Sequence, residues 1–458
     1  MERFRTIWDF LRTSFWFVPS LMVIGAVALA GITFAVERRI TDIGADAPWY
    51  IYVGDPGDAM GVLSTILSSM ITMASLVFSI TMVVLTLAAN QFGPRLIRSF
   101  MANPQTQIVL GTFVMTIIYC LLALPLLESR QPSEKLPYAS VSIALALTLI
   151  SVVLLVLFLD NLARSIVSET VIERVGRELD KILDELEPLS AGNPAAIQPQ
   201  QVLPADFDQR AVFFGPSAAG YVLAIQFDEL IAAATKADAV IGLYFRAGHY
   251  VVPGAREIAI YPRERFTLEL AAEIRKAIIT GIHRTPVQDL DFSIRHLDEI
   301  ADRALSAAVN DPYTAVAVID RVSASLCRLM GRALPTGVFR DNSGAVRVVC
   351  TEPSYAGLIG ASFNQVRQNG AGIPIIVLHL LEAIERIAQH VQLPAQHAAL
   401  TEQATAIIEA AQRRIKDSLD RKAIDERYQA AQRSLAFAAQ PWSGREVRWR
   451  GNADPKQH

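Results

Sequence analysis

The sequence predicts an α-helical membrane protein with four transmembrane helices, followed by a cytoplasmic α+β domain that is mostly helical. Four long uncharged apolar runs lie between residues 13 and 160, and ordinary charge returns after them. Short β-type runs then appear among helical patterns. Each apolar run exceeds the roughly 20 residues that a helix needs to cross a hydrocarbon core.

The four runs differ in how they begin and end. The first, 13–36, follows three arginines and is too long for a signal-peptide core. The second, 59–94, would extend on the order of 50 Å as one helix at about 1.5 Å per residue. The third and fourth are 104–127 and 136–159. We therefore expect four retained spans.

The distribution of Lys and Arg predicts the orientation of these spans, because cytoplasmic flanks carry more of them. One side has the arginines before the first run, Arg95 and Arg98 after the second, and those following the fourth. The other side has fewer, in an acidic loop at 37–58 and near residue 130. Both termini are therefore expected in the cytoplasm.

The remainder of the chain divides by composition and period. The expected domains are 1–165 (four transmembrane helices), 166–204 (amphipathic helix and linker), 205–263 (small α+β module), 264–440 (helical, with one β-hairpin at 338–350) and 441–458 (basic, aromatic tail). Strands are expected at 220–225, 240–250 and 257–261. Helices are expected at 161–187, 227–236, 265–281, 291–308, 312–334, 354–368, 374–391, 396–419 and 421–439.

Four sequence blocks carry a family resemblance: QFGPR at 91–95, GYVLAI, RAGHYVVPG, and the stretch at 288–315. Over almost its whole length the chain resembles the bacterial predicted membrane proteins grouped as domain of unknown function 2254. The resemblance implies four N-terminal spans and a cytoplasmic domain, and no established activity. The expected location is the bacterial inner (plasma) membrane. The family's paired histidines after the fourth span are replaced here by Asp160 and Asn161. Its acidic residue in the RAGHYV block is replaced by His249.

The second run carries small and hydroxyl residues at helical spacing. They would share one face of an ideal helix. Such a face serves either as a close helix-to-helix seam, with hydroxyls bonded to the carbonyl four residues earlier, or as a pore wall. The candidate pore-lining residues are Thr65, Ser68, Thr72, Ser75, Ser79, Thr86 and Asn90, with Arg95 and Arg98 at the inner mouth.

An acidic cluster at 289–311 is the candidate ligand or cation site of the cytoplasmic part. Asp298 and Asp302 lie four residues apart on one helical face, and Asp311 begins the next helix. Together they could bind a divalent cation. The alternative is that Asp311 caps its helix while the other two pair with nearby arginines or face water.

Several classes of function are disfavoured by the sequence. Phosphate-binding loops, nucleophile elbows, paired-histidine zinc helices and dinucleotide fingerprints are all missing from it, so no catalytic residue, cofactor or resident metal is expected. Its three cysteines fit neither a disulfide framework nor a zinc site. A net charge of −3 gives no field for nucleic acid. A hydrolytic site at the acidic cluster ranks last.

The leading hypothesis is an oligomeric inner-membrane channel or pore-forming protein with a cytoplasmic assembly or regulatory domain. Its expected partners are the lipid bilayer, further copies of itself, and ions or small solutes. The arginine-bearing inner mouth favours anions and the acidic outer loop favours cations, so the selectivity stays open. The alternative is a membrane-anchored sensor or scaffold whose cytoplasmic domain binds a small ligand or a protein.

Overall fold

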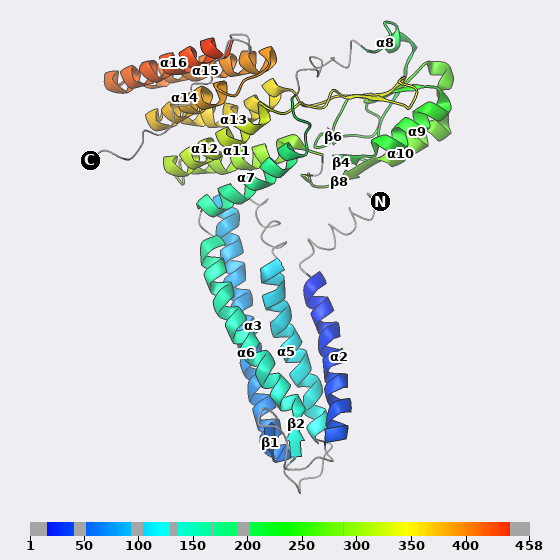
Figure 1. The fold of residues 1–458 in the computed structure, drawn as a ribbon, viewed down its shortest axis with the longest axis vertical. Helices are drawn as coiled ribbons and strands as arrows, with labels where there is room; N and C mark the ends of the chain where they lie inside the picture. Colours follow the sequence, from blue (N-terminus) through cyan, green and yellow to red (C-terminus); the bar gives the residue numbers. More distant parts are fainter. Residues whose placement is uncertain are drawn as a thin grey trace, which may run out of the picture. The chain divides into compact units, whose positions relative to one another are not determined.

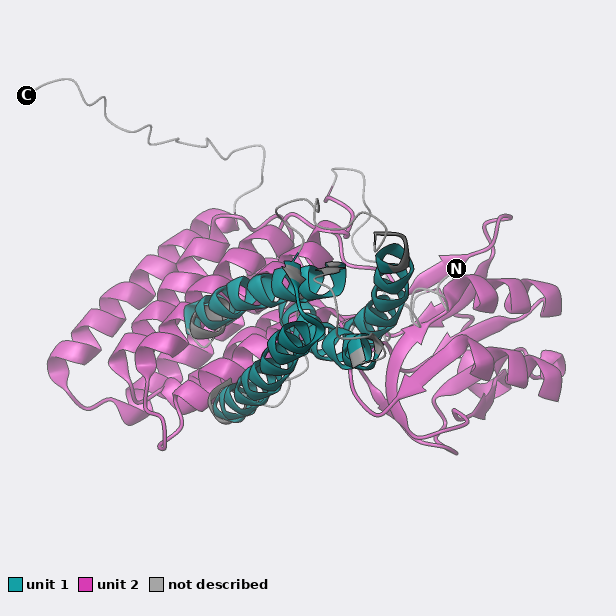
Figure 2. Cartoon of the chain, turned by 90° about the horizontal axis from the view of Figure 1, so that it is seen from below, with its two compact units in different colours: residues 1–171 teal, residues 172–458 magenta. Residues whose placement is uncertain are grey.

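The structure is a computed structural model that describes residues 16–40, 52–92, 104–128, 136–165, 168–189, 202–286 and 288–439. The chain divides into two compact units, residues 1–171 and 172–458 (Figure 2). Arg95, Arg98, the linker at 190–201, most of the acidic loop and the C-terminal tail lie outside the described residues, as do the arginines before the first span.

The first unit contains the four predicted membrane helices. They are α2 (Phe17–Ile40), α3 (Pro56–Phe92), α5 (Pro104–Glu128) and α6 (Ala139–Ser165), and each is long and apolar enough to cross a membrane (Figure 1). The fourth begins three residues later than predicted, because Leu136–Tyr138 forms strand β2, antiparallel to β1 (Tyr52–Gly54). Pro137 disfavours helical backbone at the residue before it.

Helix α5 is the centre of this unit and contacts the other three helices. Its Phe113 and Tyr119 are buried. Gly111 allows α2 to approach closely, since a Cβ there would overlap the Met22 side chain. Helix α3 buries Leu63, Met70 and other apolar residues at spacings of three, four and seven. One face of α3 therefore holds it to the bundle.

The second unit contains two sheets. The larger has the order β3 (Val212–Phe214), β7 (Ile258–Tyr261), β5 (Val240–Leu243), β10 (Val346–Cys350) and β9 (Val338–Arg340); the smaller has β6 (Tyr250–Val251), β4 (Gly220–Ile225) and β8 (Ile278–Gly281). Only the β10–β5 pairing is parallel among these described strands. Helices α9 (Phe227–Ala237) and α10 (Leu268–Ala277) share their apolar core. Short helical turns occur at α8 (Phe207–Arg210) and η3 (Arg263–Arg265).

Two sequence predictions change here. The helix predicted at 265–281 ends at Ala277, and the β-branched residues Ile278, Ile279 and Thr280 continue as β8. The boundary drawn at 263/264 also cuts both sheets, because β8 pairs with β4 and β10 pairs with β5. The strands before residue 264 pair with one another, but both sheets also take strands from after residue 264.

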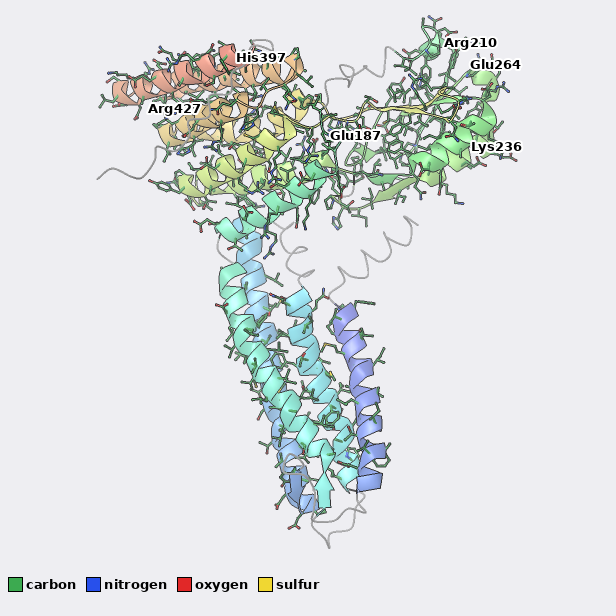
Figure 3. The ribbon with its side chains drawn as sticks, viewed as in Figure 1. Glu187, Arg210, Lys236, Glu264, His397 and Arg427 are labelled. Atoms are coloured by element: carbon green, nitrogen blue, oxygen red, sulfur yellow. The ribbon has the colours of Figure 1, made fainter. Side chains whose placement is uncertain are left out.

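Besides α7 (Ser168–Asp184), the described part of the second unit has six further helices: α11 (Leu290–Ala304), α12 (Pro312–Leu329), α13 (Tyr355–Gly370), α14 (Pro374–Ala388), α15 (Pro394–Arg414) and α16 (Ser418–Ala438). Contacts run from α11 to α13 to α15 and from α12 to α14 to α16. The helix predicted at 161–187 is divided, since α6 ends at Ser165 and α7 spans Ser168–Asp184. After α7, the Glu187 carbonyl (labelled in Figure 3) accepts a 2.8 Å hydrogen bond from the Ala333 amide.

Candidate functional site

The hydroxyl face of α3 points away from the bundle. Its six described hydroxyl residues are all exposed in the single chain: Thr65, Ser68, Thr72, Ser75, Ser79 and Thr86. At 3.6 residues per turn, the centre of this face lies about 180° from the centre of the buried face of α3. Asn90 belongs to α3, but its side chain is not among those described. The hydroxyl face is thus no seam between helices of one chain.

The threonines of this face satisfy their hydroxyl protons within the helix. Thr65 Oγ1 donates to the Gly61 carbonyl at 2.8 Å, and Thr72 Oγ1 donates to the Ser68 carbonyl at 2.9 Å. Thr86 Oγ1 likewise donates to the Met82 carbonyl at 2.9 Å. Such back-bonding removes the cost of an unsatisfied donor in a membrane and leaves the oxygen lone pairs facing outward.

Large apolar residues border the hydroxyl face on both sides. The two ridges are Leu76, Val83 and Leu87 on one side and Ile71, Phe78 and Met82 on the other, and all six are exposed. Each ridge repeats at intervals of seven and then four residues, so it runs parallel to the hydroxyl stripe. The outward side of α3 therefore has a narrow polar stripe between two apolar ridges.

In the second unit, much of the predicted acidic cluster is engaged in ion pairs. Asp289 is 2% exposed and lies 2.6 Å from Arg284, while Asp291 lies 2.7 Å from Arg246. Burial raises the pKa of Asp289 although Arg284 opposes the rise. Arginine pairing was the alternative expected for Asp298 and Asp302. In the structure it is found for Asp289 and Asp291 instead, and Asp291 also lies 3.9 Å from Arg295 of α11.

Asp298, Asp302 and Asp311 do not converge on one point. Asp311 caps α12, with its two oxygens accepting from the Thr314 amide at 3.1 Å and hydroxyl at 2.6 Å. Asp302 accepts from Gln365 and Asn369. Among the described residues, no group of three His, Cys, Asp or Glu side chains could hold a metal ion. The shared divalent-cation site therefore gains no support, because Asp311 is committed to its helix start.

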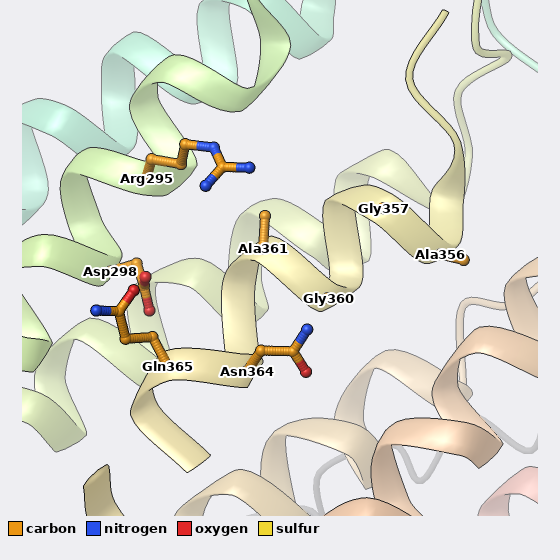
Figure 4. Close-up of a pocket in the computed structure, with 8 residues that line it drawn as sticks. All are labelled: Arg295, Asp298, Ala356, Gly357, Gly360, Ala361, Asn364 and Gln365. Atoms are coloured by element: carbon orange, nitrogen blue, oxygen red, sulfur yellow. The ribbon is translucent and has the colours of Figure 1, made fainter. Parts of the chain in front are cut away.

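Asp298 instead lines a pocket between α11 and α13, with a cavity volume of ≈ 280 Å³ (Figure 4). Small residues of α13 form the floor: Ala356, Gly357, Gly360 and Ala361. Arg295, Asn364 and Gln365 supply polar groups around it. The two glycines, Gly357 and Gly360, were not among the predicted site residues. Their spacing with Ala361 and Asn364, which combines small and polar residues on one helical face, is the signal that could have revealed the pocket.

Asp298 has the most perturbed environment in this pocket. It is 8% exposed, and its Oδ1 has no hydrogen-bond partner within the described part of the chain. Burial raises its pKa to about 7, with a further contribution from the nearby Asp302. A carboxyl group that changes its charge near neutral pH is thus placed beside the exposed guanidinium of Arg295.

We expect Asp298→Asn to stabilise the protein at pH 8. The folded state holds the Asp298 proton up to about pH 7, whereas the unfolded chain releases it near 3.9, so stability falls as the pH rises between these values. A neutral amide removes that penalty, which we place at about 1–4 kcal/mol. Calorimetric unfolding of the full chain at pH 5 and pH 8 measures it. An equal effect of the substitution at both pH values would contradict this origin.

The fold and these sites define a membrane protein with four apolar spans and a second, mixed unit. A family model described as "Predicted membrane protein (DUF2254)" matches residues 12–386, so the chain belongs to that family. The resemblance inferred from the sequence blocks is therefore confirmed.

The chain is similar to "Uncharacterized protein Rv1290c" of Mycobacterium tuberculosis (strain ATCC 25618 / H37Rv) and "Uncharacterized protein Mb1321c" of Mycobacterium bovis. Each is 31% identical over 432 residues, 93% of this chain and 81% of the relative. No solved structure matches.

Proposed function

We propose that the protein is an oligomeric pore of the bacterial inner membrane, in which copies of α3 surround a common axis. One observation carries the proposal: the hydroxyl face of α3, with Ser75 near its middle, is directed away from the helices of its own chain. A polar stripe on the outward side of a membrane helix is stabilised by contact with a partner helix or with water, and not by contact with lipid.

The two apolar ridges support a ring arrangement. In a ring, each α3 would pack Leu76, Val83 and Leu87 against the ridge of Ile71, Phe78 and Met82 on the next copy. The stripe between the ridges would then face the axis. Its outward oxygen lone pairs could replace part of the water around an ion or small solute. Closed rings of identical chains are the common way to bury such complementary surfaces.

The proposal also includes an orientation of the chain and a role for the second unit. The termini and the second unit lie in the cytoplasm, where the second unit serves assembly or regulation. Arg95 and Arg98 follow α3 in the sequence and stand at the inner mouth. Purified protein in liposomes should conduct ions or release a small trapped solute. Intact liposomes that show neither current nor release at any protein density would contradict the proposal.

The pocket at Asp298 favours a second candidate function, a membrane-anchored sensor whose second unit binds a small ligand. The pocket combines a buried carboxyl, the Arg295 guanidinium and a backbone-lined floor, which suits a small molecule bearing both an amino or amide group and an acidic group. Gly360→Leu would fill the floor. Calorimetry of the full chain against zwitterionic metabolites should show a rise in melting temperature that Gly360→Leu abolishes; a rise retained by this variant would exclude the pocket.

A further inference from the structure

A small cavity lies within the membrane unit, between α2, α5 and α6. Its polar lining consists of Thr33, Glu37, Tyr119 and Ser140, and apolar side chains of α2 and α5 complete the wall. The cavity volume is ≈ 10 Å³. That is about the space needed for the centre of one water-sized particle. The cavity therefore suits a single small occupant.

A carboxylate lines this cavity at the end of a membrane-spanning segment. Glu37 is the last residue of the candidate span of α2 and is 3% exposed. Its Oε1 accepts a 2.6 Å hydrogen bond from the Ser140 amide, at the beginning of α6. The positive end of the α6 dipole offsets part of the cost of the charge. Acidic side chains in membrane helices are expensive and usually mark functional sites. From the sequence, residue 37 was expected to begin the acidic loop that follows the first run.

The neighbouring hydroxyls leave their oxygens available as acceptors. Thr33 donates its proton to the Leu29 carbonyl at 2.7 Å. Tyr119 lies 3.3 Å from both Thr33 Oγ1 and the Ser140 carbonyl, so its single proton has local acceptors. Acceptor oxygens thus gather beside the carboxylate.

Ser140 supplies the observation that points to an occupant. Its side chain is 6% exposed and its Oγ has no hydrogen-bond partner among the described residues. Because it lines the cavity, a bound particle would satisfy it. Leaving a buried hydroxyl unsatisfied is costly, and buried polar groups are almost always partnered.

We propose that this cavity is a binding site for a small monovalent cation, Na⁺, held by the Glu37 carboxylate and the oxygens of Ser140, Thr33 and Tyr119. An all-oxygen lining suits a hard cation. The described lining contains one carboxylate, and its single negative charge matches a monovalent ion. The cavity size favours a dehydrated ion no larger than water. The inference does not rest on the pore proposal.

The test is thermal unfolding of the full chain in detergent, in NaCl, KCl or choline chloride at constant ionic strength. We expect a higher melting temperature in NaCl, which increases with NaCl concentration because the ion binds only the folded state. Ser140→Ala removes the unpartnered Oγ and keeps the amide that binds Glu37. It should need about tenfold more NaCl for the same shift. Glu37→Gln should abolish the NaCl response.

Thr148→Val is the matched control, since the Thr148 hydroxyl on α6 bonds only to the Ala144 carbonyl of its own helix among the bonds found. It should keep the full NaCl response. Equal melting temperatures in the three salts would overturn the proposal and leave water as the occupant. An unchanged NaCl dependence in Ser140→Ala would also overturn it, even if Glu37→Gln failed to fold.

Discussion

Ser75→Leu should reduce ion or solute flux through reconstituted protein at least about tenfold, since an apolar constriction in a narrow pore prevents wetting. Ser75 is exposed and lies near the middle of the hydroxyl face of α3, so the substitution would place leucine side chains of every copy around the axis. The measurement is flux per protein in liposomes of fixed composition.

Ser69→Leu is the matched control for this variant. Ser69 is also exposed on α3, but at 100° per residue it lies about 80° from the centre of the hydroxyl face, in line with the ridge that contains Leu76 and Leu87. A leucine there extends an existing apolar ridge, and flux should be retained. If both variants reduced flux equally, the loss would reflect general damage to α3 and would contradict a specific role for Ser75.

Asp180→Ala should destabilise the second unit by about 2 kcal/mol, because Arg321 and Ser325 both lose the carboxylate to which they donate hydrogen bonds, although Arg321 keeps its ion pair with Glu173. Arg321 of α12 is 13% exposed and lies 2.7 Å from Asp180 of α7. Hydrogen bonds from Arg321 and Ser325 hold the pKa of Asp180 below its usual range, against the effect of burial. A Cβ at Gly176 would overlap Arg321, so this glycine makes room for the pair. Calorimetry of the full chain measures the loss.

Asp184→Ala provides the comparison for Asp180→Ala. Asp184 lies one turn further along α7, pairs with Arg332 at 2.7 Å, and has a side chain that is 50% exposed. Exposed ion pairs contribute little, so this loss should stay below about 1 kcal/mol. Equal losses of unfolding free energy in the two variants would contradict a larger contribution from the Asp180–Arg321 pair.

The membrane helices could be predicted from sequence because length and the lack of charge suffice to identify a span. The period of Thr65, Ser68 and Thr72 also identified the hydroxyl face. Its direction could not be predicted, since that depends on which face of α3 meets α5. In the structure, the hydroxyl residues of this face from Thr65 to Thr86 are exposed, which shows that the face is directed away from α5.

The second unit was harder to predict because its organising contacts are distant in sequence. Strand β10 lies about a hundred residues after β5, and only their pairing shows that the module and the hairpin share one sheet. The same holds for Asp298, whose burial arises where α11 meets α13. Local spacing suggested a pair with Asp302 but could not indicate a pocket.

The most direct test of the central claim is the reactivity of Ser75→Cys with a charged, membrane-impermeant thiol reagent in liposomes, followed by mass spectrometry of the α3 peptide. The reference is Leu149→Cys on α6, a position that is 67% exposed in the single chain and lies in the middle of its span. A wet path along α3 predicts that Ser75→Cys reacts at least about tenfold faster, because thiolate formation needs water. Equally slow modification at both positions would contradict the claim that the hydroxyl face lines a pore.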